Sequence, residues 1–112
     1  MNEWKDVSNL AEQLDFFEER YGVKIQGLFI TSNDEFRIII TGELYAREGN
    51  KLTKDIQLII TVHDVDGRIV DRGQIDFQAA WFFAFRAFSI SFNLPISLSK
   101  VAKVRVYPQS IC

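Results

Sequence analysis

The chain's single histidine and single cysteine are the side chains best suited to acid–base and thiol chemistry. A general base needs a nucleophile and an orienting group within hydrogen-bond reach. Asp64 directly follows His63, and neighbouring residues of a strand point to opposite faces. Cys112 ends the sequence, where chains are poorly ordered and a catalytic thiolate is not expected. We therefore interpret His63 as a structural residue and expect no catalytic residue at either position.

The segment Asp64-Val65-Asp66-Gly67-Arg68 resembles the start of a calcium-binding loop. An EF-hand loop needs an oxygen ligand at its fifth position, Gly at its sixth and Glu at its twelfth. These positions hold Arg68, Ile69 and Ile75, so we interpret the segment as a plain turn. The sequence also lacks a Gly-rich phosphate loop and the motifs of serine hydrolases and zinc peptidases. We expect a protein that is not an enzyme and that uses no metal and no cofactor.

The charge balance argues against a nucleic-acid partner. Fifteen acidic and thirteen basic residues give a net charge of -2, so no global basic field exists. Lys103, Arg105 and Tyr107 alternate along one expected strand and could follow a phosphate backbone. Charges on an edge strand also prevent aggregation, and we favour that role. The apolar runs are far shorter than the roughly 18 residues of a membrane-spanning helix, so we expect no membrane partner.

The aromatic segment 79–88 has the strongest claim to a binding role. Five of its ten residues are large aromatics, and Arg86 is its only charge. A strand cannot bury three consecutive rings on one side, and aromatic residues with a nearby Arg are enriched in interface hot spots. Two alternatives remain open: a plug that folds back into the core, or a surface for a protein partner or self-association. The candidate partner-binding residues are Trp81, Phe82, Phe83, Phe85 and Arg86.

The elements that position these residues begin with an expected helix over residues 1–22. Its apolar residues recur every three or four positions, and Gly22 follows the last of them as a C-terminal cap. Six acids and two bases give this segment a charge of -4, whereas nine acids and eleven bases give the other 90 residues +2. We expect the acidic helix to pack on the sandwich of residues 23–112, within a single domain. The apolar stripe consists of Trp4, Val7, Leu10, Ala11, Leu14, Phe17 and Tyr21.

From Val23 onward the apolar period changes to two, and β-branched and aromatic residues predominate. Turn residues separate the runs, and no helical segment lies between them, which excludes the alternation of a parallel α/β fold. The pattern predicts a mainly β protein, an immunoglobulin-like antiparallel β-sandwich of about six strands. The expected strands cover residues 23–31, 36–46, 55–64, 68–77, 85–93 and 101–107.

Side-chain alternation also predicts details of packing. A type I turn over residues 64–67 places Val62 opposite Val70, whereas a two-residue loop places Val62 opposite Asp71. We favour the first register because it pairs apolar with apolar residues, and it places His63 opposite Ile69. Ile39 and Ile59 lie on faces that should be polar if solvated, so we expect the N-terminal helix to cover them. The alternative is a detached helix that binds a partner.

Residues 62–70 resemble the strand–turn–strand signature of bacterial immunoglobulin-like sandwich domains of the FxLYD type. Phe88-Ser89-Ile90-Ser91-Phe92 is similar to the later phenylalanine-containing strand of that family, and the resemblance covers residues 36–93. The chain departs from the family at His63, where relatives have Tyr, and at residues 79–83, where relatives have Pro-Gly. The resemblance implies a non-enzymatic β-sandwich and transfers no catalytic residue.

Together these patterns favour a non-catalytic interaction or structural module. It would bind a protein partner, or itself as a homodimer, through an aromatic patch or a sheet edge. One alternative is a small-ligand or carbohydrate-binding module with Trp81 as a stacking platform, and another is an accessory subunit of a larger assembly. The polar N-terminus lacks the features of a signal peptide, and a lone cysteine forms no internal disulfide, so the expected compartment is the cytoplasm.

Overall fold

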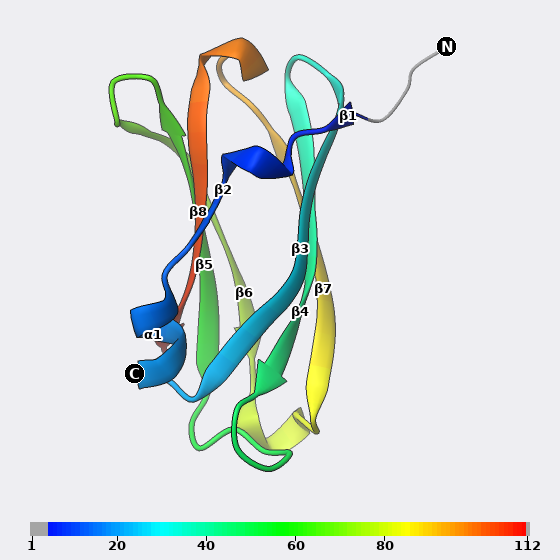
Figure 1. Ribbon diagram of the computed structural model, residues 1–112, viewed down its shortest axis with the longest axis vertical. Coiled ribbons are helices and arrows are strands. Elements are labelled where there is room, and N and C mark those ends of the chain that lie inside the picture. Colours follow the sequence, from blue (N-terminus) through cyan, green and yellow to red (C-terminus); the bar gives the residue numbers. More distant parts are fainter. Residues whose placement is uncertain (1–4, 112) are drawn as a thin grey trace.

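The computed structural model describes residues 5–111 and shows a β-sandwich of two four-stranded sheets (Figure 1). Six long strands lie within three residues of their predicted ranges, which confirms the mainly β class. Within residues 5–111 the one α-helix has six residues, too few to cross a bilayer. The elements are β1 (Lys5–Asp6), η1 (Ser8–Leu10), β2 (Ala11–Gln13), α1 (Asp15–Arg20), β3 (Val23–Asp34), β4 (Arg37–Ala46), β5 (Ile56–Asp64), β6 (Ile69–Phe77), η2 (Ala79–Trp81), β7 (Phe85–Asn93), η3 (Leu98–Lys100) and β8 (Val101–Ser110).

The strand order is β1-β3-β4-β7 in one sheet, called sheet A, and β2-β8-β5-β6 in the other, called sheet B. Neighbouring strands are antiparallel, except that β2 runs parallel to β8. On one side of the sandwich the short strands β1 and β2 follow each other along the chain through η1. On the other side β7 and β6 form the two edges and contact each other.

The core lies between the sheets and is built by alternating residues of the central strands. Ile38, Ile40 and Leu44 of β4 are fully buried, as strand alternation requires of residues that share one face. Phe36, which the same alternation assigns to the core, is 53% exposed because β4 begins only at Arg37, at the end of the sandwich. The fully buried residues on the facing side of β5 are Ile56, Leu58, Ile60 and Val62.

A glycine in β6 sets how closely the two sheets approach. A Cβ atom on Gly73 would lie 2.8 Å from Cδ1 of Ile90 and 2.8 Å from Cζ of Phe92. Both of these residues belong to β7 in the opposite sheet. The missing side chain therefore lets the β7 side chains pack against the β6 backbone, which closes this side of the sandwich.

The N-terminal segment does not form the predicted helix over residues 1–22. Residues 5–13 are extended apart from the turn η1, and the α-helix is confined to Asp15–Arg20. Trp4 lies outside the described residues. The apolar spacing thus predicted which residues become partly buried, but it did not predict the conformation of the segment. The members of the predicted stripe that pack against the core are Val7, Leu10, Ala11 and Tyr21.

Backbone pairing explains why this segment is extended. The Val7 amide donates to the Ile30 carbonyl at 2.8 Å, and the Ser8 hydroxyl accepts from the Ile30 amide at 2.9 Å. The chain then crosses to sheet B, where β2 pairs with β8. A helix would satisfy only its own backbone and would leave the edges of β3 and β8 unpaired. Short isolated helices are also marginal in water, so tertiary pairing overrides the helical period.

The short helix α1 lies beside β3 and β8 at one side of the sandwich (Figure 1). A buried carboxylate fixes it there. Glu18 is 2% exposed and accepts hydrogen bonds from the Ile25 amide at 3.0 Å and from Nε2 of Gln13 at 3.2 Å. This one side chain therefore joins α1 to both β3 and β2.

The prediction that a long helix covers the outer faces at Ile39 and Ile59 is wrong, since the contacts of α1 are concentrated on β3 and β8. Ile59 is nevertheless 1% exposed. It lies opposite Tyr107 of β8, whose ring centroid is 5.6 Å from that of Phe17 in α1. The helix contributes to covering Ile59 through this aromatic pair. Ile39 is partly buried between its neighbours on β3 and β7.

The turn between β5 and β6 has the predicted type. The Gly67 amide donates to the Asp64 carbonyl at 3.0 Å, and Gly67 has a φ of 84°, which glycine adopts readily. One carboxylate oxygen of Asp64 accepts from the amides of Asp66 and Arg68, each at 2.9 Å. These backbone contacts account for the Asp-x-Asp-Gly pattern as a turn.

The register beyond the turn is partly different from the predicted one. His63 lies opposite Ile69, as predicted. The predicted pairing of Val62 with Val70 is wrong, because a bulge between Val62 and His63 shifts the ladder by one residue. Val62 lies opposite Asp71 instead. The bulge leaves Val70 half-buried beside the ladder.

Candidate interaction surface

The predicted aromatic segment divides between the core and the surface. Phe82 is 4% exposed and packs edge-on against Phe77, with ring centroids 6.3 Å apart. Its neighbours Trp81 and Phe83 are 74% and 67% exposed, and Phe85 is 45% exposed. Phe82 therefore belongs to the core and not to the exposed site. The other three rings define a surface that we call the aromatic patch: Trp81, Phe83 and Phe85.

Hydrogen bonds at both ends of the loop hold the patch in place. The Asp55 carboxylate accepts a 2.8 Å hydrogen bond from the Ala79 amide. The Ala84 amide donates to the Asn50 carbonyl at 2.6 Å, and the Ala84 carbonyl accepts from Ala46 at 3.1 Å. Ala84 has a φ of 63°, a left-handed conformation that costs an L residue roughly 1–2 kcal/mol. The loop backbone is thus fixed near both ends, and the rings of residues 81–83 alternate between the surface and the core.

Two further side chains border the patch. Tyr45 of β4 stacks on Phe85, with centroids 5.1 Å apart and planes at 18°. Its hydroxyl donates to Glu43 at 3.2 Å, and removal from water together with the Glu43 carboxylate raises the pKa of the Tyr45 phenol. Arg86 donates from Nη1 to the Trp81 carbonyl at 3.3 Å, so this predicted site residue contacts the loop backbone. Sequence reasoning missed Tyr45, because only the pairing of β4 with β7 places it beside Phe85.

Strand β7 follows the patch and forms an edge of sheet A (Figure 1). At the two ends of its ladder with β4, Ala46 donates to Ala84 at 3.1 Å and Leu94 donates to Phe36 at 2.7 Å. Bonded and non-bonded pairs alternate along an antiparallel ladder, so the even-numbered residues of β7 bond to β4. No strand of the described chain lies beyond β7. The central residues whose backbone groups face away from β4 are Ala87, Ser89 and Ser91.

This edge lacks the usual protection against pairing with other chains. Native proteins block exposed edges with charges, proline, bulges or short strands. β7 has nine residues with no proline and a single charge, Arg86. The edge strand β6 has the same length but carries Asp71, Arg72 and Asp76, while β1 and β2 have two and three residues. β7 is therefore the edge best suited to accept an added strand.

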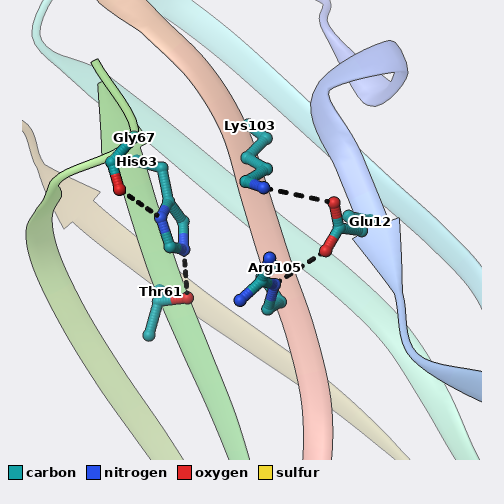
Figure 2. Close-up of polar contacts among 6 residues, drawn as sticks. All are labelled: Glu12, Thr61, His63, Gly67, Lys103 and Arg105. Atoms are coloured by element: carbon teal, nitrogen blue, oxygen red, sulfur yellow. Dashed lines mark hydrogen bonds and ion pairs between the residues drawn. The ribbon is translucent and has the colours of Figure 1, made fainter. Parts of the chain in front are cut away.

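A polar pair on the outer face of sheet B has the composition of a nucleophile and a base (Figure 2). Oγ1 of Thr61 lies 2.8 Å from Nε2 of His63, and Nδ1 of His63 lies 3.4 Å from the Gly67 carbonyl. A carbonyl only accepts, so these partners assign the proton of the neutral ring to Nδ1. Nε2 then accepts a hydrogen bond from the Thr61 hydroxyl.

The burial of this pair favours a structural role. Thr61 and His63 are 4% and 5% exposed, so both side chains lie beneath their neighbours. Two surface hollows of about 190 and 250 Å³ lie elsewhere, one beside Asn33 and the other beside Tyr21. Both are smaller than the roughly 300–1,000 Å³ of typical small-molecule sites.

The basic side chains beside this pair are engaged within the chain. Oε1 of Glu12 accepts from Nε of Arg105 at 2.7 Å, and Oε2 lies 3.5 Å from Nζ of Lys103 (Figure 2). The Arg105 hydrogen bond, and then the attraction of both cations, lowers the pKa of Glu12 in spite of partial burial. These ion pairs join the acidic N-terminal segment to the basic strand β8. They also engage Lys103 and Arg105, the two basic residues considered for a phosphate track. The expected role of these charges in protecting an edge strand is wrong, because β8 lies between β2 and β5.

Comparison with known proteins gives distant likenesses to parts of larger proteins. No protein-family model and no curated protein sequence matches the chain. A putative β-galactosidase from Bacteroides fragilis is 14% identical with a TM-score of 0.39, and the match covers 80% of this chain and 16% of that one. A β-glucuronidase from glycoside hydrolase family 2 is 15% identical with a TM-score of 0.36, over 81% of this chain and 11% of that one. The chain thus spans less than a fifth of the length of either enzyme.

Proposed function

We propose that this chain is a non-catalytic interaction module that binds a protein partner through the aromatic patch and the β7 edge beside it. The observation that carries the proposal is the exposure of Trp81 and Phe83, 74% and 67%, on a loop whose backbone is fixed by hydrogen bonds. A fixed loop loses little conformational entropy when a partner covers its rings. The patch is therefore already arranged for binding.

Two kinds of contact would contribute to the affinity. An added strand on β7 gains main-chain hydrogen bonds, which are insensitive to sequence. The rings of Trp81 and Phe83 supply apolar area, and burying one such side chain is worth roughly 1.5–3 kcal/mol. The edge would hold the partner in register, while the patch would select a partner with an apolar surface at the matching position.

The proposal depends on this surface and not on a fold name. When β1 to β8 are lettered A, A′, B, C, D, E, F and G, the two sheets have the strand orders A-B-C-F and A′-G-D-E. Constant-type immunoglobulin domains instead have the sheets ABED and CFG. Many sandwich domains share the two-sheet architecture with a different order. The immunoglobulin-like assignment and the likeness to FxLYD-type domains therefore stay predictions.

The test compares two double variants that each remove two exposed apolar side chains. Trp81→Ser with Phe83→Ser removes the patch, whereas Val65→Ser with Ile69→Ser removes residues that are 68% and 58% exposed at the β5–β6 turn. Each tagged protein is used to capture partners from native lysate, and captured proteins, including this chain itself, are quantified by mass spectrometry. Thermal unfolding of each variant checks the fold.

We expect at least one protein to be retained by the unaltered chain and by the turn variant, and to be lost with the patch variant at an unchanged Tm. Loss of cooperative unfolding in the patch variant would assign the rings to the core and overturn the proposal. Equal retention by all three proteins would also contradict it. A saturable change in tryptophan fluorescence with sugars, absent in Trp81→Phe, would instead support a carbohydrate-binding module.

A further inference from the structure

We infer that the partner is a second copy of this chain, and that two β7 strands pair antiparallel about a two-fold axis at Ser89. The inference rests on the proposed function, because it names the partner of the same edge and patch. β7 runs from Phe85 to Asn93, so Ser89 is its central residue. A two-fold axis at this residue lets the two strands overlap along their full length.

The backbone groups of β7 match those of a second β7 in this arrangement. Ser89 lies opposite Ser89 of the second copy, and Ala87 lies opposite Ser91 of the second copy. All three residues have N–H and C=O groups that face away from β4. Each opposed pair therefore exchanges two hydrogen bonds, and roughly six such bonds join the two copies of sheet A.

The side chains along the junction leave the strands free to approach. Ala87, Ser89 and Ser91 are small, uncharged and exposed on the outer face of sheet A. The alternate residues Phe88 and Phe92 point into the core of their own copy and are 7% and 6% exposed. On the outer face of β7, no bulky or charged side chain lies between Ala87 and Ser91.

The same axis brings exposed apolar groups together at both ends of the paired strands. The aromatic patch lies at the start of β7, whereas Phe36, 53% exposed, is held beside its end by the 2.7 Å hydrogen bond from Leu94. The exposed Pro95 follows Leu94. Antiparallel pairing places the patch of one copy level with Phe36 and Pro95 of the other, and the symmetry repeats this arrangement at the opposite end. A single strand from an unrelated protein accounts for the patch but not for Phe36, so a second copy is favoured.

The interface would be modest in size. A standard interface buries about 800 Å² on each partner, and a strand edge alone supplies less. The apolar groups at the two ends supply the remainder, so dissociation in the micromolar range is expected. Light scattering coupled to size exclusion, from low to high micromolar protein, measures this equilibrium.

The first test replaces the residue on the axis. Ser89→Pro removes an N–H that faces away from β4, so it breaks no hydrogen bond within the chain. We expect dimerisation at least about tenfold weaker than in the unaltered chain, because each dimer loses two donors. Ser89→Ala keeps the N–H and should dimerise like the unaltered chain. Thermal unfolding shows whether both variants keep the fold.

A second test remains decisive if the proline variant unfolds. A residue on the two-fold axis opposes itself, so Ser89→Lys and Ser89→Glu should each dimerise poorly alone through repulsion of like charges. An equimolar mixture should form the Lys–Glu heterodimer, which native mass spectrometry resolves by mass. Gln74→Lys and Gln74→Glu, on the exposed face of β6, are the matched controls and should dimerise alone.

The outcomes separate this inference from the proposed function. A monomer at all concentrations, with lysate capture still lost in the Trp81/Phe83 variant, overturns the self-pairing and leaves the interaction module standing. A dimer that resists Ser89→Pro but is lost with Trp81→Ser and Phe83→Ser overturns the edge pairing alone. A monomer with equal capture by the patch and turn variants contradicts both proposals.

Discussion

The backbone amide of Ile25 donates a 3.0 Å hydrogen bond to the carboxylate of Glu18, a side chain that is only 2% exposed. The second oxygen of that carboxylate accepts from Gln13, whose amide nitrogen also donates to the Ile25 carbonyl at 3.2 Å. The segments β2, α1 and β3 therefore meet at a single buried group, although the sequence presents the first two as one amphipathic run. A buried acceptor of this kind is costly to lose, because its donors have no water to replace it.

Removing Glu18 should destabilise the fold. We expect Glu18→Ala to lower the free energy of unfolding by about 1–3 kcal/mol, since the Ile25 amide and the Gln13 side chain lose their acceptor. Glu18→Gln keeps one accepting oxygen and should have a smaller effect. Urea unfolding measures both, with Glu19→Gln at the exposed neighbouring position as the control, expected within about 0.5 kcal/mol of the unaltered chain. Equal midpoints for Glu18→Ala and the control would contradict this role.

The ion pairs of Glu12 should make stability depend on pH. The pKa of Glu12 is lowered from its ordinary value of 4.5, mainly by the Arg105 hydrogen bond. The contribution is therefore present above pH 4.5 and is lost as the pH falls through the lowered folded-state pKa. Because Glu12 is partly exposed, we expect Glu12→Gln to cost about 0.5–1 kcal/mol at neutral pH.

Urea unfolding of Glu12→Gln across this range is the check. The difference from the unaltered chain should shrink toward zero as the solution is acidified to about pH 3. Glu19→Gln, which replaces an exposed carboxylate on α1, controls for the general effect of removing one charge. A difference that stays constant with pH would show that Glu12 acts through packing and not through its charge.

The close approach at Gly73 should not tolerate a methyl group. We expect Gly73→Ala to destabilise the protein by about 1–3 kcal/mol, because its Cβ would meet Cδ1 of Ile90 and Cζ of Phe92, each at 2.8 Å. Ile90→Val removes one of these two atoms. The loss of stability in the double variant should therefore be smaller than the sum of the losses in the two single variants. Additive effects in a denaturant-based double-mutant cycle would place the strain elsewhere.

Thr61 and His63 should be energetically coupled. Thr61→Val leaves Nε2 of His63 without its 2.8 Å partner and should cost about 1–2 kcal/mol. His63→Phe should cost a similar amount by leaving the buried Thr61 hydroxyl unpaired. In the double variant both polar groups are gone, so its cost should be smaller than the sum of the single costs. The same cycle analysis measures the coupling, and a value near zero would mean that the contact does not form in solution.

The sequence predicts most where partners are close along the chain or where a face repeats regularly. The period of two at Ile38, Ile40 and Leu44 was sufficient for β4, since core-facing residues alternate whatever strand lies opposite. Val62 is buried on the face that the alternation predicts, but its predicted pairing with Val70 is wrong. A bulge is set by the local geometry of the paired strands and leaves no signature in apolar spacing. The helical period of residues 1–22 misled for a different reason. Its edge partners β3 and β8 are known only once the fold is known.

The candidate site was predictable to a similar degree. The consecutive rings at residues 81–83 could not all be buried on one side of a strand, but the sequence left open whether they form a core plug or an exposed surface. The left-handed turn at Ala84 and the hydrogen bonds to Asp55 and Asn50 accompany the burial of Phe82. Tyr45 carried no signal of its own, because its contact with Phe85 arises from the register of two strands that are distant along the chain.

The division of the N-terminal segment between the two sheets has a consequence for synthesis. β1 lies on β3, which emerges from the ribosome soon after it. β2 pairs with β8, and the Glu12–Arg105 ion pair joins positions 93 apart. At usual rates of translation, β2 must wait roughly 5 to 20 seconds for that partner. In a nascent chain the N-terminal segment would thus be paired with sheet A only. The arrival of β8 would then both complete sheet B and close the sandwich.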